Sequence, residues 1–116
     1  MSPLRLAILL PLLWTAAPSV AAGPLRFWNL TGGTITRLEL APAGTQAWGA
    51  NQTANDPDGA VDADERLKLS GVQPGRYDVR LTDKSGRVCV VRNVEVVADK
   101  PYAFSVSEQD LTDCHH

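Results

Sequence analysis

The chain has 116 residues, a length suited to one domain, with 11 basic and 13 acidic side chains and a formal net charge of −2. Its Lys and Arg residues stand singly along the sequence and form no basic run. This distribution argues against nucleic acid or an anionic membrane as the partner, because both are bound mainly by clustered positive charge.

Residues 1–22 have the layout of a secretory signal peptide. Arg5 supplies the positive charge, residues 6–14 are apolar, and small residues follow up to a cleavage point after Ala21 or Ala22. The apolar run is too short to span a bilayer core of about 30 Å, so no membrane span is expected. The segment predicts a periplasmic or secreted protein whose mature part is a single domain, residues 23–116.

The rest of the chain shows the period of two that is typical of β-strands and no extended helical period. The pattern predicts strands at residues 25–30, 34–41, 67–70, 77–82, 87–97 and 102–106. We expect a bulge near residues 92–93 and a hairpin turn that ends at Gly86. Six or seven short strands without a long helix favour an all-β fold, a small antiparallel β-sandwich, over a small barrel.

Residues 45–66 interrupt this pattern with one long polar loop that has too few apolar residues to supply core. Loops of this length in compact domains are commonly functional or disordered. Candidate binding residues in the loop are Trp48, Asn51, Asn55, Asp56 and Asp58. Trp28 and Trp48 are both expected to pack in the core or anchor a loop, and a ligand-facing position is the alternative for Trp48.

Two groups of side chains offer metal ligands. The loop carries oxygen ligands that suit calcium, although their spacing does not match an EF-hand: Asp56, Asp58, Asp62, Asp64 and Glu65. The chain ends in Cys114, His115 and His116, ligand types that suit copper or zinc if the cysteine is free.

The cysteines, Cys89 and Cys114, are even in number, as expected for a disulfide in a small exported domain. The bond would close a loop of about 25 residues and stabilise the domain by about 3.5 kcal/mol in the chain-entropy model. A redox pair is not expected, because the spacing is not Cys-x-x-Cys.

Several short motifs resemble those of a group of small exported bacterial proteins of unknown function. These motifs are FWNLTG at residues 27–32, PAG at 42–44, WG at 48–49 and PGRYDV at 74–79. The group pattern is aromatic-Asn-x-Thr-Gly, then Pro-x-Gly, then Trp-Gly, and this chain departs from it in the longer Asn/Asp-rich loop after residue 49. The Pro-Gly-x-Tyr turn is also similar to that of transthyretin-like accessory sandwiches. The resemblance implies a β-domain and supplies no catalytic residue.

No catalytic constellation is expected, because the two histidines are the last two residues of the chain and a frayed end does not position a base. The sequence therefore predicts an exported accessory or binding protein of the bacterial envelope that is not an enzyme and has no cofactor. It would bind a protein or another envelope component through loop 45–66 or a sheet edge. The alternative is a periplasmic metal-handling protein that uses the acidic loop or the histidine pair. The oligomeric state stays open.

Overall fold

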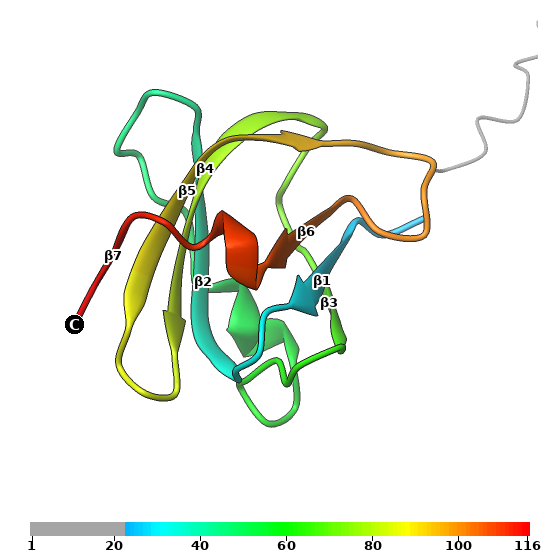
Figure 1. Cartoon of the computed structure of the whole chain (residues 1–116). Coiled ribbons are helices and arrows are strands. Elements are labelled where there is room, and N and C mark those ends of the chain that lie inside the picture. The colour runs from blue at the N-terminus through cyan, green and yellow to red at the C-terminus, as the bar shows by residue number, and fades with distance from the viewer. Residues whose placement is uncertain (1–22) are drawn as a thin grey trace, which may run out of the picture.

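The computed structural model describes residues 23–116, and the predicted signal peptide lies outside this range. Seven strands and two short 3₁₀ turns make up the described part of the chain (Figure 1). In chain order they are β1 (Arg26–Leu30), β2 (Ile35–Pro42), η1 (Gln52–Asn55), β3 (Arg66–Lys68), β4 (Gly75–Asp83), β5 (Val88–Val96), β6 (Phe104–Ser107), η2 (Glu108–Asp110) and β7 (Cys114–His115). None of the helical turns within residues 23–116 is long and apolar enough to cross a membrane.

The strands form two packed sheets, which confirms the predicted all-β sandwich. The smaller sheet has the order β3-β1-β6 and the larger has the order β2-β4-β5-β7. One detail of the prediction was wrong, because β1 and β6 pair in parallel rather than antiparallel. Alternation of apolar and polar residues reports which face of a strand is buried, but it does not encode the direction of the neighbouring strand.

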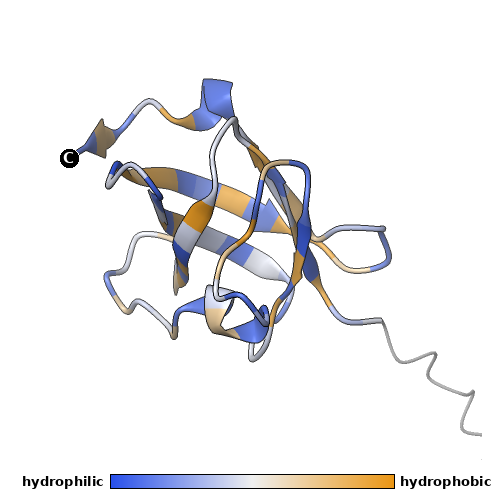
Figure 2. Ribbon diagram, turned by 90° about the horizontal axis from the view of Figure 1, so that it is seen from below, coloured by the Kyte–Doolittle hydropathy of each residue, from blue (hydrophilic) through white to orange (hydrophobic). Residues whose placement is uncertain are grey.

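The core forms where the apolar faces of the two sheets meet. Phe27 of β1 contacts Phe104 of β6 with ring centroids 5.0 Å apart, and both pack toward the buried residues Leu38, Val79 and Leu81 of the larger sheet. Figure 2 shows the matching alternation of hydrophobic and hydrophilic residues along the strands. The expectation that loop 45–66 adds nothing to this core was wrong, because Val61 is fully buried in it.

Two local irregularities follow the sequence prediction. The register of β4 and β5 shifts between Tyr77 and Val79, and Asn93 takes the left-handed conformation with φ 57°, so the bulge at residues 92–93 is confirmed. Gly86 ends the β4–β5 turn with φ 88°, which a residue with a side chain adopts only with strain.

Cys89 and Cys114 form the predicted disulfide, which ties β7 to β5. The two residues are directly opposite each other in the antiparallel pair, and Cys89 is fully buried. The covalent bond therefore holds the last residues of the chain against the larger sheet, as expected.

Candidate functional site

Loop 45–66 is an ordered cover over the free edge of β2. Val61 exchanges two main-chain hydrogen bonds with Ile35 at one end of that strand, of 2.8 and 2.9 Å. Further along β2, the side-chain amide of Asn51 bonds as a neighbouring strand would. Its Oδ1 accepts a hydrogen bond from the main-chain N–H of Leu38 at 3.0 Å. Gly49 donates its N–H to a β2 carbonyl at 2.9 Å. These main-chain groups of the β2 edge are thus bonded within the chain.

The same segment also covers the end of β3. The Gln52 side chain accepts from the N–H of Ser70 at 2.9 Å and donates to the C=O of Ser70 at 3.0 Å, as a neighbouring strand would. Asn55 donates its Nδ2–H to the C=O of Lys68 at 2.8 Å. Three side-chain amides of residues 51–55 therefore close one side of the sandwich, between the edges of β2 and β3. Figure 1 shows the backbone of the turn η1 in this position.

Four of the five predicted binding residues of this loop have side chains engaged with the protein itself, and the exposed Asp58 contributes only its main-chain N–H. Asn51 and Asn55 hold the strand edges, and Asp56 accepts from the main-chain N–H of Asp58 at 2.8 Å. The Trp48 ring lies beneath the guanidinium of Arg80, with Cζ 4.4 Å from the ring centroid. Trp48 anchors the loop on the larger sheet, as one of the two interpretations predicted.

The structure does not bring the predicted metal ligands together. No group of three His, Cys, Asp or Glu side chains suited to a metal ion exists within residues 23–116. Asp62 accepts from the Thr34 hydroxyl, Glu65 from the N–H of Asp62, and Asp64 from the indole N–H of Trp28. The sulfur of Cys114 is in the disulfide, and His115 and His116 are exposed at the chain end.

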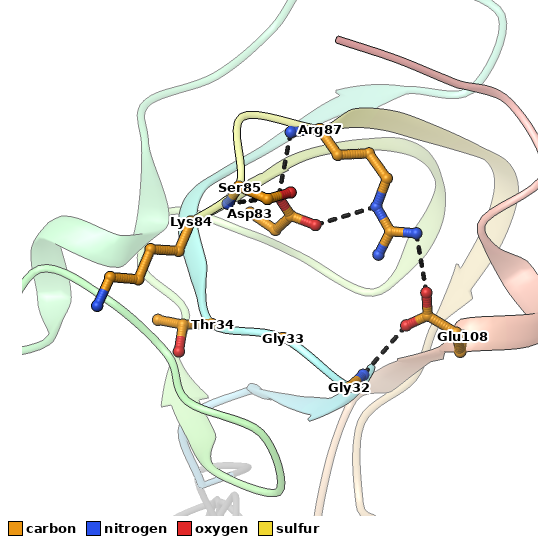
Figure 3. Close-up of a pocket in the computed structure, with 8 residues that line it drawn as sticks. All are labelled: Gly32, Gly33, Thr34, Asp83, Lys84, Ser85, Arg87 and Glu108. Carbon is orange, nitrogen blue, oxygen red and sulfur yellow. Dashed lines mark hydrogen bonds and ion pairs between the residues drawn. The ribbon is translucent and has the colours of Figure 1, made fainter.

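An open pocket of about 620 Å³ lies between the β4–β5 turn, the segment after β1 and η2 (Figure 3). Arg87 spans it, donating to Asp83 at 3.0 Å and to Glu108 at 2.8 Å, while Glu108 also accepts from the N–H of Gly32 at 3.1 Å. Lys84 extends away from this network in Figure 3. Arg87 is thus paired with both carboxylates, and this geometry fastens three chain segments together.

Charges on the outer face of the larger sheet are paired in the same way. Glu39 is buried and accepts from Arg37 at 2.9 Å and from Arg80 at 3.0 Å. Burial raises the pKa of Glu39, but the hydrogen bonds and charges of the two arginines outweigh it and leave that pKa below its ordinary value.

Asp78 is the second buried carboxylate of this face. The main-chain N–H groups of Asn93 and Gly44 donate to it at 2.9 and 3.0 Å, and Arg92 lies 3.7 Å away. These hydrogen bonds lower the pKa of Asp78, against the effect of burial. The carboxylate therefore fixes the bulge of β5 and the turn after β2 at once.

The outer face of the smaller sheet is different, because its cations make no ion pair with a carboxylate within residues 23–116. Phe27 and Leu67 point inward, so their neighbours along each strand point outward. The register places Arg26 directly opposite Lys68 and Trp28 directly opposite Arg66. These residues and Tyr102 form what we name the basic–aromatic face: Arg26, Trp28, Arg66, Lys68 and Tyr102.

The aromatic part of this face is held in place. Trp28 donates its indole N–H to Asp64, with 3.0 Å to Oδ1, and its ring centroid lies 5.1 Å from that of Tyr102. The guanidinium carbon of Arg66 lies 4.4 Å from the centroid of the indole ring. A stacked guanidinium retains the N–H groups at its edge for an anion.

Five cationic side chains in the described part of the chain make no ion pair, and three of them are on the basic–aromatic face. The expectation that the basic residues do not cluster was therefore wrong. Arg26 and Lys68 are far apart in the sequence and become neighbours only through the β1–β3 register. The sequence signal for this cluster was the alternation of outward residues, namely Arg, Trp and Leu in β1 and Arg and Lys in β3.

No protein-family model, no curated protein and no solved structure matches this chain.

Proposed function

We propose that this chain is an exported, non-catalytic binding protein of the bacterial envelope, periplasmic or secreted, which binds an anionic envelope component through the basic–aromatic face. The observation that carries the proposal is the opposition of Arg26 and Lys68 in one cross-strand pair. Like charges in that position destabilise a sheet. A bound anion would relieve the repulsion and complete the missing ion pairs.

Export is supported by the signal-peptide pattern and by the disulfide. The bond between Cys89 and Cys114 belongs to a class that persists in oxidising compartments and is rare in the cytosol. The resemblance to small exported bacterial proteins agrees with this location.

The state of the carboxyl groups argues against one catalytic role, that of a general acid. Glu39, Asp78, Asp83 and Glu108 all have pKa values below the ordinary range, and each accepts hydrogen bonds from neighbouring donors. A general acid at neutral pH needs the opposite, a raised pKa and a proton to give. These four groups act as permanent anions that hold the fold together.

The basic–aromatic face has better support than loop 45–66 or the sheet edges beside it. The amide groups of that loop are already bonded to β2 and β3, so a partner would have to displace them. Metal handling has no comparable support, since the loop carboxylates accept hydrogen bonds from separate donors. The face is the part of the described surface where unpaired cations and fixed aromatic rings coincide.

The proposal is tested by co-sedimentation of the mature protein with an envelope fraction prepared from its own host. We expect the wild-type protein to sediment and to be released by salt, because exposed charge pairs are screened. The double variant Arg26→Gln/Lys68→Gln should remain in the supernatant. Lys84→Gln is the matched control, because Lys84 is another exposed cation without an ion pair, and it should behave as wild type. Equal retention of the double variant would refute the proposal, as would a wild-type protein that never sediments.

A further inference from the structure

We infer that the anion bound by the basic–aromatic face is an acidic polysaccharide, whose sugar rings pack on Tyr102 beside the stacked pair of Trp28 and Arg66 while its carboxylates meet Arg26, Arg66 and Lys68. This inference rests on the proposed function, because it names the class of ligand for the same face.

The aromatic surface is held rigidly in place. Asp64 takes the left-handed conformation with φ 69°, and both its side chain and its carbonyl accept from the Trp28 indole, at 3.0 and 3.3 Å. Asp64 is in turn fixed to β1, since its own N–H donates to Asn29 at 2.7 Å. The indole is thus set before any ligand arrives, and Tyr102 extends the aromatic surface next to it. The C–H face of a sugar ring packs well on such preset aromatic rings.

The cations around these rings are spaced by the strand geometry and the β1–β3 register. Arg66 and Lys68 are two residues apart on one strand, about 7 Å, and Arg26 is about 5 Å across from Lys68. The three charges and Trp28 therefore occupy the four corners of a small patch of flat sheet. A polymer that carries one carboxylate on each ring presents sugar faces and anions at comparable intervals.

A peptide ligand fits this surface less well. Peptides that add to a sheet use the main-chain groups of an open edge. The edge of β3 beside the patch is covered, because Asn55 bonds to Lys68 and Gln52 bonds to Ser70. An acidic peptide would have to lie on the flat face without those main-chain bonds, where it would gain charge contacts alone.

An anionic membrane also fits less well. Leu30 is the exposed large hydrophobic residue of this face, 38% accessible, but it lies at the end of β1 that approaches acidic groups. Glu108 accepts from Gly32 there, and Asp64 covers the indole of Trp28. A negatively charged bilayer would be repelled at that end, whereas a single polysaccharide strand can follow the cationic end.

The test uses the mature chain and three probes in titration calorimetry: oligogalacturonate, its neutral methyl ester, and an oligoglutamate of equal charge. We expect oligogalacturonate to bind at least tenfold more tightly than either of the others, because only it offers sugar rings and carboxylates together. Equal binding of oligoglutamate would overturn the polysaccharide assignment and leave an anion-binding face. Failure of all three probes, with envelope retention intact, would overturn this inference without touching the proposed function.

Single substitutions then identify which residues contact the polysaccharide. Arg26→Gln and Lys68→Gln should each weaken oligogalacturonate binding by about tenfold, the loss of one charge-assisted contact. Arg66→Lys keeps the charge but loses the stacked, forked geometry and should also weaken binding severalfold. Tyr102→Leu removes an aromatic ring without changing charge, and should affect oligogalacturonate more than oligoglutamate. Lys84→Gln should change neither, and a Tyr102→Leu protein with unchanged oligogalacturonate affinity would refute the role of the aromatic rings.

Discussion

The outer faces of the two sheets treat their charges in opposite ways. On the larger sheet, Glu39 is buried between Arg37 and Arg80, and Asp78 is buried against main-chain N–H groups. On the smaller sheet, Arg26 lies opposite Lys68 with no carboxylate partner. Both faces carry charge, but only the first has donors and acceptors that are matched within the chain.

This difference distinguishes a surface whose charges stabilise the fold from a surface whose charges are available to a ligand. A charge whose partners are built into the fold contributes to stability and has little left to offer a ligand. A charge that lacks a partner and faces a like charge contributes nothing to stability, so it remains available to a ligand. Substitutions on the larger sheet should therefore lower stability and leave binding intact, whereas those on the smaller sheet should do the reverse.

The largest effect is expected for Asp78→Ala on the larger sheet. The change leaves the N–H groups of Asn93 and Gly44 without an acceptor and removes one of the two carboxylates that pair with Arg92. We expect a loss of about 3 kcal/mol in the free energy of unfolding, measured by urea denaturation. Asp113→Ala is the control, because Asp113 is exposed and also lies 3.7 Å from Arg92, and it should cost less than about 0.5 kcal/mol. Similar costs for the two variants would contradict the structural role of Asp78.

Glu39→Gln should have the next largest effect. The amide keeps the shape of the side chain but loses the charge that Arg37 and Arg80 share, so we expect a loss of about 2 kcal/mol in the free energy of unfolding. Glu95→Gln is the matched control, since Glu95 is exposed and only 3.7 Å from Arg76, and should be nearly neutral. Unchanged envelope retention of Glu39→Gln would show that the two faces are independent.

Much of the fold is readable from the sequence, because it depends on local rules. The alternation of Tyr77, Val79 and Leu81 predicts a half-buried strand, and a glycine at position 86 predicts the hairpin turn. The candidate site is not readable in this way. Arg26 and Lys68 meet only when the β1–β3 register is known, and a one-residue slip of β3 would turn Lys68 toward the core and away from Arg26.

The prediction that loop 45–66 adds nothing to the core was wrong for a related reason. Polar residues such as Asn51 and Gln52 indicate solvent exposure when they are considered one at a time. In the fold their amide groups replace the main-chain groups of a strand, which composition does not reveal.

The same contrast predicts how stability depends on pH. The pKa values of Glu39, Asp78 and Asp83 are all lowered in the folded protein, so the unfolded chain takes up protons first as the pH falls. The stability these groups supply is fully present above the unfolded values of about 4 and is lost as the pH falls through the folded values. The free energy of unfolding from urea denaturation should be level near neutral pH and decline below about pH 5, by about 1.4 kcal/mol per pH unit for each extra proton that the unfolded chain binds, and the urea midpoint should fall with it. A midpoint that rises in acid would contradict this assignment.

The smallest effect on stability, and the sharpest test of the contrast, is expected for Arg26→Gln and Lys68→Gln. Removing either cation relieves the cross-strand repulsion, so each single variant should gain about 0.3 kcal/mol in the free energy of unfolding. The second substitution should gain nothing further, because the repulsion is already gone, and a double-mutant cycle measures this non-additivity directly. Added salt should abolish the coupling, since both side chains are exposed. A favourable coupling between the two cations in the free protein would mean that an internal anion already neutralises them, and the face would then resemble the larger sheet.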